Sequence, residues 1–418
     1  MKILLYGINY APEQTGIGKY SGEMGAWLAA RGHDVRVITA PPYYPEWKIG
    51  AGYSAWSYRT EKMGGVTVFR CPLWVPKKVT GSARIVHLAS FALSSLPVAM
   101  RNIFWRPDVV FTLEPPFFCA PAAVLTAACS GATSWLHVQD FEVDAALELG
   151  VLKLPGLKSL VLWMEKFITR RFRVRSTISK RMMERLEQKA GTSDGNVFFP
   201  NWVDVDAIYP LDRQSVFRDE LGLSAETKVA VYSGNMGMKQ GLEIVIEAAR
   251  LLKDRSDLKF IMCGAGAAYE TLRKQAEGLE NIIWMPLQPF EKLNDLLNLA
   301  DLHLLPQRAD AADLVMPSKL TGMLASGRPV LATALPGTQV YELVEKVGKV
   351  VPPTNEQAFA EAILELIDAP QGSKELGLNA RRIAVEELAI GPILQKFEET
   401  LVATRSLRRA RVPVQETR

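Results

Sequence analysis

The feature that most constrains the fold is an alternation of short, continuous apolar segments with longer helical ones. The first 40 residues contain "KILLYGI", a loop with Gly16 and Gly18, a helix that stops at Gly32, and then "HDVRVITA". Apolar strands without a polar face are typical of parallel sheets that helices cover on both sides. Further strands are expected at residues 66–70, 108–112, 134–138 and 174–178, with helices between them. The N-terminal half therefore predicts a doubly wound α/β domain.

The alternation is interrupted once. Residues 197–212, "VFFPNWVDVDAIYPLD", contain two prolines and alternating aspartates and indicate a connector. A second α/β pattern runs from "KVAVYSG" to "DLHLLP", and 418 residues also exceed one ordinary core. The fold class predicted is α/β, with two facing Rossmann-like domains and an interdomain cleft. The expected divisions are residues 1–203, residues 204–385, a helix at 386–404 that packs back on the first domain, and a basic tail at 405–418.

A helix start in the second half is a candidate anion site. The stretch "MPSKLTGMLASGRPVLAT" places Pro317, Ser318 and Lys319 at the beginning of a helix that leads into a buried strand. In open parallel sheets, ligands bind where strands end and helices begin. Unpaired backbone amides and the helix dipole favour an anion there, and Lys319 adds a positive charge. The alternative is an ordinary helix cap with a solvated lysine.

Two glycine-rich loops follow strands of the same domain. "YSGNMGMKQGLE" contains Gly234 and Lys239, and "CGAGAAYETL" contains Gly264 and Gly266. Glycines allow a close backbone approach, and a lysine can neutralise a phosphate. Neither loop has P-loop spacing or a complete dinucleotide motif, so each alone also fits a plain strand-to-helix turn. With Lys319 they predict a diphosphate site between two lysines.

The N-terminal half offers polar groups for an acceptor. "WLHVQDFEVD" ends a strand with His137 and Asp140 among several polar residues, which could bind a sugar hydroxyl or assist proton transfer. His137 alternates within the strand, so a hydrogen-bonded core histidine is a strong alternative, and Asp140 is the preferred candidate. The "PEQTGIGKY" loop, with Gly16 and Gly18, could close over an acceptor or a diphosphate.

Charge and composition narrow the classes of partner. The formal net charge is only +4, but residues 153–189 hold eleven Lys/Arg against three glutamates, interleaved with Leu, Trp and Phe. Such a segment can lie against an anionic membrane, or it can be a solvated helix face. No His/Cys cluster has metal spacing, and the "DVD" at 204–206 lies in the connector, so we expect no metal cofactor. We expect no nucleic-acid partner either.

Cysteine usage and the apolar segments bear on the compartment. The four cysteines are scattered in apolar surroundings without a C-x-x-C motif, which predicts reduced core residues in a cytoplasmic protein. "MKILLYGINYAP" lacks the pattern of a signal peptide. Residues 117–136 are uncharged and long enough to raise the question of a membrane span, but Pro121 and Gly131 interrupt them. A buried helix, a turn and a strand fit that segment better.

With these residues in place, the chain resembles the family 4 glycosyltransferases, which are retaining enzymes of the GT-B fold. The resemblance covers nearly the whole chain. It is carried by the N-terminal glycine loop with "ARGHDVRVIT", by "ISKRMMERL", by "FFPNWVDVDAIYP", by "NIIWMPLQPFEKLNDLLNLADLHLLP" and by "MLASGRPVLAT". These segments together are specific, although any one of them alone is not.

The chain also departs from the family pattern. The family's Arg and Lys of G-R-x-x-x-x-K-G correspond to Asn235 and Gln240, with Lys239 one place earlier. The family's E-x7-E is absent, and Leu314 and Gly322 fall at its positions. A Pro-Ser-Lys variant of that segment is similar to the subgroup that builds bacterial exopolysaccharides, colanic acid among them, and O-antigens.

The residue patterns above and the resemblance together assign roles to individual residues. Catalytic roles fall to Asp140, Lys239 and Lys319, the two lysines by neutralising the leaving diphosphate. Acceptor contacts fall to Gly16, Gly18 and His137. Donor contacts fall to Gly234, Asn235, Gly264, Gly266, Leu287, Asp313 and Ser318, where Leu287 belongs to the segment that flanks the nucleotide base and Asp313 stands beside the missing glutamate.

The implied reaction is transfer of a hexose from a nucleotide diphosphate sugar, with retention of anomeric configuration and without a metal. The implied acceptor is a lipid-linked oligosaccharide at the inner face of the plasma membrane, where the enzyme would be cytoplasmic and peripheral. The subgroup points to fucose from GDP-fucose. Two alternatives remain at this stage, a sugar-nucleotide 2-epimerase of the same fold and a non-catalytic two-lobed nucleotide-sugar binding protein.

Overall fold

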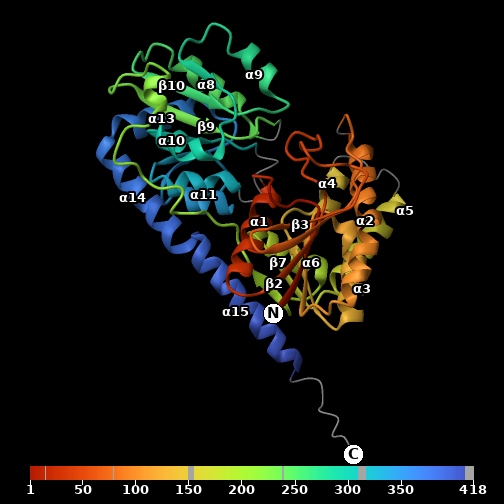
Figure 1. The fold of residues 1–418 in the computed structure, drawn as a ribbon. Helices are drawn as coiled ribbons and strands as arrows, with labels where there is room; N and C mark the ends of the chain where they lie inside the picture. The colour runs from red at the N-terminus through yellow and green to blue at the C-terminus, as the bar shows by residue number, and fades with distance from the viewer. Residues whose placement is uncertain (15, 79, 149–154, 238–239, 309–316, 410–418) are drawn as a thin grey trace, which may run out of the picture. The chain divides into compact units, whose positions relative to one another are not determined.

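The computed structural model describes residues 1–418 apart from 15, 79, 149–154, 238–239, 309–316 and 410–418. It divides the chain into two compact units. The first comprises Met1–Pro200 and the segment from Leu394 on, and the second comprises Asn201–Ile393. Each unit is built around one sheet, and Figure 1 labels their elements.

The first unit contains an eight-stranded sheet in the order β3-β4-β2-β1-β5-β6-β7-β8, counted over the described residues. All neighbours are parallel except β3 and β4. The strands are β1 Lys2–Tyr6, β2 Asp34–Thr39, β3 Arg59–Met63, β4 Val66–Arg70, β5 Val109–Glu114, β6 Thr133–Val138, β7 Val174–Thr177 and β8 Asn196–Phe198. Every residue of β5 and β6 is buried, as the continuous apolar runs predict.

Helices cover this sheet on both faces. They are α1 Gly16–Ala30, α2 Gly81–Ile103, η1 Phe117–Cys119, α3 Ala120–Ser130, α4 Glu142–Glu148, α5 Pro155–Thr169 and α6 Lys180–Ala190. Local sequence sets their ends: the Thr80 side chain caps α2 by accepting from the Ala83 amide, and Gly131 ends α3 in the left-handed conformation. Helices α2, α3, α5 and α6 pack in that order as one layer, because each successive pair is in contact.

The C-terminal helix α15, Ile390–Arg409, belongs to the first unit from Leu394 on. Phe397 is buried, with its ring centroid 5.3 Å from that of Phe111, 5.2 Å from that of Trp135 and 4.3 Å from that of Phe199. The carboxylate of the next residue, Glu398, pairs with Arg31 Nε at 2.6 Å. The helix therefore completes the core on the sheet face opposite to α2 and α3.

The second unit contains a six-stranded parallel sheet in the order β11-β10-β9-β12-β13-β14, again over the described residues. The strands are β9 Lys228–Ser233, β10 Leu258–Cys263, β11 Ile282–Met285, β12 Leu302–Leu305, β13 Val330–Thr333 and β14 Gly348–Val351. The helices are α7 Phe217–Glu220, α8 Glu243–Leu251, α9 Tyr269–Gln275, η3 Phe290–Lys292, α10 Leu293–Asn298, α11 Ser318–Ala325, α12 Gln339–Val344, α13 Glu356–Asp368 and α14 Pro370–Glu387.

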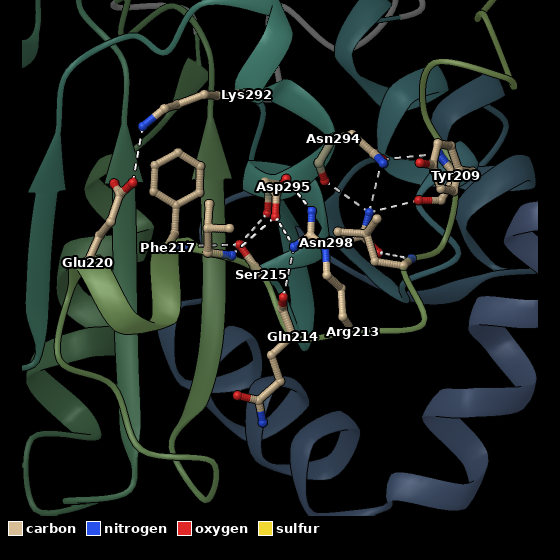
Figure 2. Close-up of polar contacts among 12 residues, drawn as sticks. Tyr209, Arg213, Gln214, Ser215, Phe217, Glu220, Lys292, Asn294, Asp295 and Asn298 are labelled. Carbon is tan, nitrogen blue, oxygen red and sulfur yellow. Dashed lines mark hydrogen bonds and ion pairs between the residues drawn. The ribbon is translucent and has the colours of Figure 1, made fainter.

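The predicted connector is fastened to α10 of the second unit, as Figure 2 shows. Asn298 accepts a hydrogen bond from the Leu211 amide at 2.9 Å and donates one to the Tyr209 carbonyl at 2.8 Å. Arg213 forms two hydrogen bonds with the Asp295 carboxylate, of 2.7 and 2.9 Å, and these bonds lower the pKa of Asp295. Side chains of α10 thus satisfy residues 209–213, which have no regular structure of their own, whereas the start of the predicted connector belongs to β8.

Most predicted elements are present, and one expectation about the cysteines is wrong. Residues 117–136 form η1, α3, a turn and β6, as expected, and not a span. All four cysteines are free, but Cys129 is exposed, because it lies on the outer side of α3 near its end. The expectation of four core cysteines is therefore wrong at that position. Within the described residues, α2 alone is long and apolar enough to cross a membrane by length and composition.

Replacing Phe397 by alanine is expected to destabilise the first unit by about 3 kcal/mol, because it removes a buried ring from an aromatic cluster. Lys396→Ala, at the exposed neighbouring position, is the matched control and should change stability little. Denaturant unfolding followed by tryptophan fluorescence measures both. Equal effects in the two variants, or none in either, would contradict the placement of α15 in this core.

Candidate active site

Two strand-end loops of the second unit are locked together at the carboxyl edge of its sheet. The loop after β9 and the loop after β10 exchange backbone hydrogen bonds, from the Gly234 amide to the Cys263 carbonyl at 3.0 Å and from the Met236 amide to the Ala265 carbonyl at 2.8 Å. A Cβ on Gly264, whose φ is +151°, would lie 1.9 Å from the Gly234 carbonyl oxygen. Only glycine fits there, so the motif glycines serve this close approach.

Lys319 lies against the first of these loops. Its Nζ is 4.0 Å from the ring centroid of Tyr232, the buried penultimate residue of β9. A Cβ on Gly234 would lie 3.5 Å from the Lys319 Cδ, so the glycine leaves room for the lysine stem. The Tyr232 hydroxyl donates to the Asn235 carbonyl at 2.6 Å, which fixes the ring beneath the loop. The structure thus brings together Lys319, Gly234 and Asn235.

The surroundings of Lys319 are poor in solvent. Burial lowers its pKa to about 7, because the ammonium loses hydration that the tyrosine face does not replace in full. Lys319 is the second residue of α11, whose N-cap, Pro317, supplies no side-chain hydrogen bond. An anion at this helix end would meet the helix dipole and unsatisfied amides together with a lysine whose charged form it would stabilise.

A cavity of about 350 Å³ opens beside the ends of β12 and β13. Its lining includes Gly241, Gln307 and Thr333. The Gln307 amide donates to the Thr333 hydroxyl at 2.7 Å, so the loop after β12 is bound to the end of β13. Gly241 has φ +61°, a left-handed conformation at the entrance to α8. The cavity lies at the edge of the sheet where parallel α/β proteins bind ligands.

The structure describes some of the other residues predicted to contact the donor, and others lie outside the described residues. Gly266 lies against Asn235, since a Cβ on it would be 2.6 Å from the Asn235 Oδ1. Ser318 is exposed at the start of α11, and Leu287, 52% exposed, follows β11. Lys239 and Asp313 lie outside the described residues, so their roles stay predictions.

His137 lies in the core of the first unit. Its Nδ1 is 2.9 Å from the Ser176 hydroxyl and its Nε2 is 2.9 Å from the Gln139 side-chain nitrogen, while Phe111 stacks on the ring. Burial lowers its pKa to about 3, so the imidazole is neutral. Both ring nitrogens have partners within the unit, and this is the arrangement that the core-histidine alternative describes.

The segment predicted as a glycine loop is a loop only as far as residue 14, because α1 begins at Gly16, and that loop is organised around a buried carboxylate. Glu13 accepts hydrogen bonds from the Tyr43 and Tyr44 amides, each at 3.0 Å, and from Asn9 Nδ2 at 2.9 Å. A Cβ on Gly18 would lie 2.6 Å from the Glu13 side chain, so Gly18 makes room for it. Gly16 has φ +57° at the first residue of α1. Both glycines therefore have a structural requirement here, beside the predicted acceptor contact.

Two carboxyl groups meet where β5 and β6 end. Glu114 is 2% exposed, and burial with the nearby Glu142 raises its pKa well above the usual range. The Glu142 carboxylate accepts from the Phe117 amide at 2.6 Å, and burial raises its pKa to about 7. Asp140 lies close enough to add to that rise. Asp140 thus belongs to an acidic group at the strand ends.

Sequence reasoning missed Glu114 and Tyr232. Glu114 ends an otherwise apolar strand and precedes two prolines, a pattern that could have marked it as a strand-end carboxyl. Tyr232 stands in the quoted "YSGNMG" segment, but a tyrosine near the end of an apolar strand gives no sequence signal for a contact with a lysine. His303, in contrast, is buried in β12 as expected, with Nε2 3.0 Å from the Ser326 hydroxyl. It offers no acid or base to a ligand, which disfavours the epimerase alternative.

Comparison with known proteins shows which protein family the two units resemble. A family model described as "Glycosyl transferase 4-like domain" matches residues 15–202, and one described as "Glycosyl transferases group 1" matches residues 227–369. Among solved structures, sucrose-phosphate synthase from Thermosynechococcus elongatus aligns with a TM-score of 0.76 at 16% identity, covering 97% of this chain and 99% of that one. HepE from Anabaena in complex with UDP-glucose aligns with a TM-score of 0.69 at 16% identity, covering 96% and 100%.

The two parallel-sheet units and these matches define a glycosyltransferase of the GT-B fold. The chain is also 44% identical over 407 residues, 95% of its length, to an Escherichia coli K12 protein named as a colanic acid biosynthesis glycosyl transferase, WcaI, of which it covers 98%. The chain belongs to the family 4 glycosyltransferases, in the group of that relative. The epimerase and binding-protein alternatives are therefore not retained.

Replacing Glu142 by glutamine is expected to change how stability depends on pH. The pKa of about 7 exceeds the value of 4.5 expected in the unfolded chain, so the native state binds the proton more tightly. The stabilisation is complete below pH 4.5 and is lost as pH rises through 7. The neutral amide should remove about 2 kcal/mol of that decline. Glu184→Gln, at an exposed position on α6, is the control. Unfolding curves for Glu142→Gln and wild type that stay parallel from pH 5 to 7.5 would contradict the assignment.

Proposed function

We propose that the enzyme transfers a hexose from a nucleoside diphosphate donor to a lipid-linked oligosaccharide during the assembly of a colanic-acid-like exopolysaccharide or an O-antigen. The observation that carries this proposal is the 44% identity to WcaI over nearly the whole of both chains. HepE, which shares the fold, is known in complex with UDP and with UDP-glucose. By analogy, the donor here is a nucleotide sugar, and the subgroup favours GDP-fucose.

The second unit is the proposed donor site. A diphosphate placed at the N-terminus of α11 would meet Lys319 and the amides of the Gly234 loop, with Lys239 and Asp313 assigned to the same ligand. These groups would stabilise the charge that develops on the leaving diphosphate, which is the main electrostatic demand of the reaction. In this proposal no metal is needed, because the lysines and amide dipoles neutralise the leaving group.

The first unit is the proposed acceptor site, with Asp140 at its strand ends. In the proposed retaining mechanism, the acceptor hydroxyl attacks on the face from which the diphosphate leaves. The sugar–diphosphate bond breaks, the acceptor–sugar bond forms, and a donor phosphate oxygen takes the hydroxyl proton. The enzyme is proposed to act as a cytoplasmic protein held peripherally at the inner face of the plasma membrane, where lipid-linked acceptors reside.

Product analysis tests the function. Purified enzyme with a panel of nucleotide sugars and a lipid-linked acceptor should release free nucleoside diphosphate and lengthen the acceptor by one sugar. The NMR coupling of the new anomeric proton should match that of the donor. Chelation with EDTA should leave the rate unchanged. Formation of an isomeric nucleotide sugar, or of no product with any donor, would contradict the proposal.

Lys319→Ala is expected to lower the affinity for the nucleoside diphosphate at least tenfold, because it removes a cation beside the ligand. Lys253→Ala, at an exposed position beyond α8, is the matched control.

The affinity of the wild type should fall with rising pH above 7.5, approaching tenfold per pH unit, because binding takes up a proton at Lys319, whose pKa in the free enzyme is about 7. Lys319→Arg should flatten this dependence, because arginine stays charged.

Calorimetry in two buffers of different ionisation enthalpy measures both the affinity and the proton uptake. An affinity that does not vary with pH in the wild type, or that Lys319→Ala leaves unchanged, would remove Lys319 from the site. The nucleotide could still bind at other strand ends, and the product analysis would then decide the function separately.

A further inference from the structure

Helix α5 carries its apolar stripe on the outside. Leu160, Trp163, Met164 and Phe167, spaced i, i+3, i+4 and i+7, are 51%, 61%, 45% and 45% exposed. A helix on the surface of a soluble domain normally turns such a stripe inward. Here the buried positions of the last turns include polar Glu165 instead, which is 3% exposed. Helix α5 therefore leaves its largest apolar side chains outside, while its inner side combines Glu165 with the half-buried Leu162 and Ile168.

A buried ion group holds α5 in this orientation. The Lys189 Nζ on α6 lies 2.8 Å from both carboxylate oxygens of Glu165 and 2.7 Å from the Asp144 Oδ1 on α4. Rotating α5 to bury Trp163 would expose Glu165 and remove one of the two carboxylates that pair with Lys189. Removing a partner from a buried charge is strongly unfavourable. The outward stripe is therefore a fixed feature of the fold.

The same contacts alter the interpretation of the basic segment at 153–189. Lys189 and Arg185 pair with Asp144, and Arg175 is 3% exposed and donates to the Phe172 carbonyl. These cations stabilise the unit itself. Lys158, Lys166 and Arg171 are exposed on or next to α5, and Arg171 lies 4.4 Å from the Phe167 ring centroid. The outer face of α5 is therefore apolar with a basic border.

Neighbouring helices extend the apolar face. Helix α3, which contains no charged residue, packs between α2 and α5 and exposes Leu125, at 49%. Helix α2 exposes Val86 and Leu93, at 53% and 72%, and ends beside Phe104, at 87%. Figure 1 places α2, α3 and α5 together on one side of the first unit. Exposed apolar side chains gathered on one layer of neighbouring helices are typical of an interaction site.

The charge around α2 selects the kind of partner. From residue 62 to residue 107 the sequence contains seven Lys/Arg and no Asp or Glu. Lys77 and Lys78 are exposed before α2, and Arg101 and Arg106 are exposed at its end. An apolar face bordered by cations complements the acyl chains and anionic headgroups of a membrane surface.

We propose that the outer face of α2, α3 and α5, here called the docking face, binds an anionic phospholipid bilayer by shallow insertion of side chains such as Trp163, Phe167 and Leu93. This proposal deepens the peripheral location within the proposed function and gives it a driving force that is mainly apolar. Helix α2 does not span the bilayer, because its inner side belongs to the core. There Ser95 Oγ is 2.6 Å from the Tyr6 hydroxyl, and Phe91 is fully buried.

Vesicle flotation without donor or acceptor tests the docking face. We expect wild-type protein to bind vesicles of phosphatidylglycerol and phosphatidylcholine in 0.1 M NaCl and to keep most of that binding in 0.5 M NaCl. The double variant Trp163→Ser/Leu93→Ser should bind at least tenfold more weakly at both salt concentrations. The matched control is Leu251→Ser/Leu378→Ser, which removes exposed apolar side chains from helices of the second unit and should bind as the wild type does.

A second variant separates insertion from mere attachment. Trp163→Phe retains an apolar ring, so it should bind vesicles as the wild type does but lose most of the blue shift in tryptophan fluorescence on binding. Unchanged binding of Trp163→Ser/Leu93→Ser would overturn the proposal, as would binding of the wild type that disappears in 0.5 M NaCl. Sedimentation showing a dimer that this double variant dissociates would assign the face to a second copy instead. Because the vesicles contain no substrate, these outcomes are independent of the sugar-transfer assay.

Discussion

Parallel strands end at a common edge of the sheet, so the loops that leave them compete for a small volume. In the second unit this competition is resolved where Gly264 passes within contact of the Gly234 carbonyl, an approach that no residue with a Cβ could make. The two loops then form hydrogen bonds with each other's backbone groups. Next to them, the Lys319 ammonium lies over the Tyr232 ring. The candidate donor site is thus a consequence of how the sheet ends are packed.

In the first unit a buried ion group has the comparable organising role. Glu165, Lys189 and Asp144 come from three different helices, and their mutual pairing compensates charges that would otherwise be unfavourable in the interior. Their geometry fixes which side of α5 faces inward. A core could have been built with Trp163 and Phe167 inside, and hydrophobic burial alone would favour that arrangement. The observed orientation keeps this ion group buried, so local electrostatics contributes to the direction in which α5 faces.

The sequence predicted much of the fold because periodicity and turn residues act locally. The strands at β1, β5 and β10, the glycine ends of helices, and the connector all follow from such signals. Burial within one helix follows from tertiary packing, so the exposure of Cys129 and the outward stripe of α5 were not predicted. The same holds for the candidate site: Gly234, Gly264 and Lys319 were found from motifs, whereas Tyr232 and Glu114 act through neighbours that are distant in the sequence. The family-level function was predictable because several motifs were combined.

Lys319 and the docking face have a common physical character. Each places a side chain in an unfavourable environment while the protein has no ligand. The Lys319 ammonium is desolvated, and the aromatic rings of Trp163 and Phe167 are exposed to water. Neither arrangement improves the stability of its own unit, and both would be relieved by a partner of the right chemistry, an anion for the lysine and a lipid surface for the rings. Local departures from the most stable packing are expected at functional sites. On that argument the two departures, in separate units of one chain, indicate two different ligands.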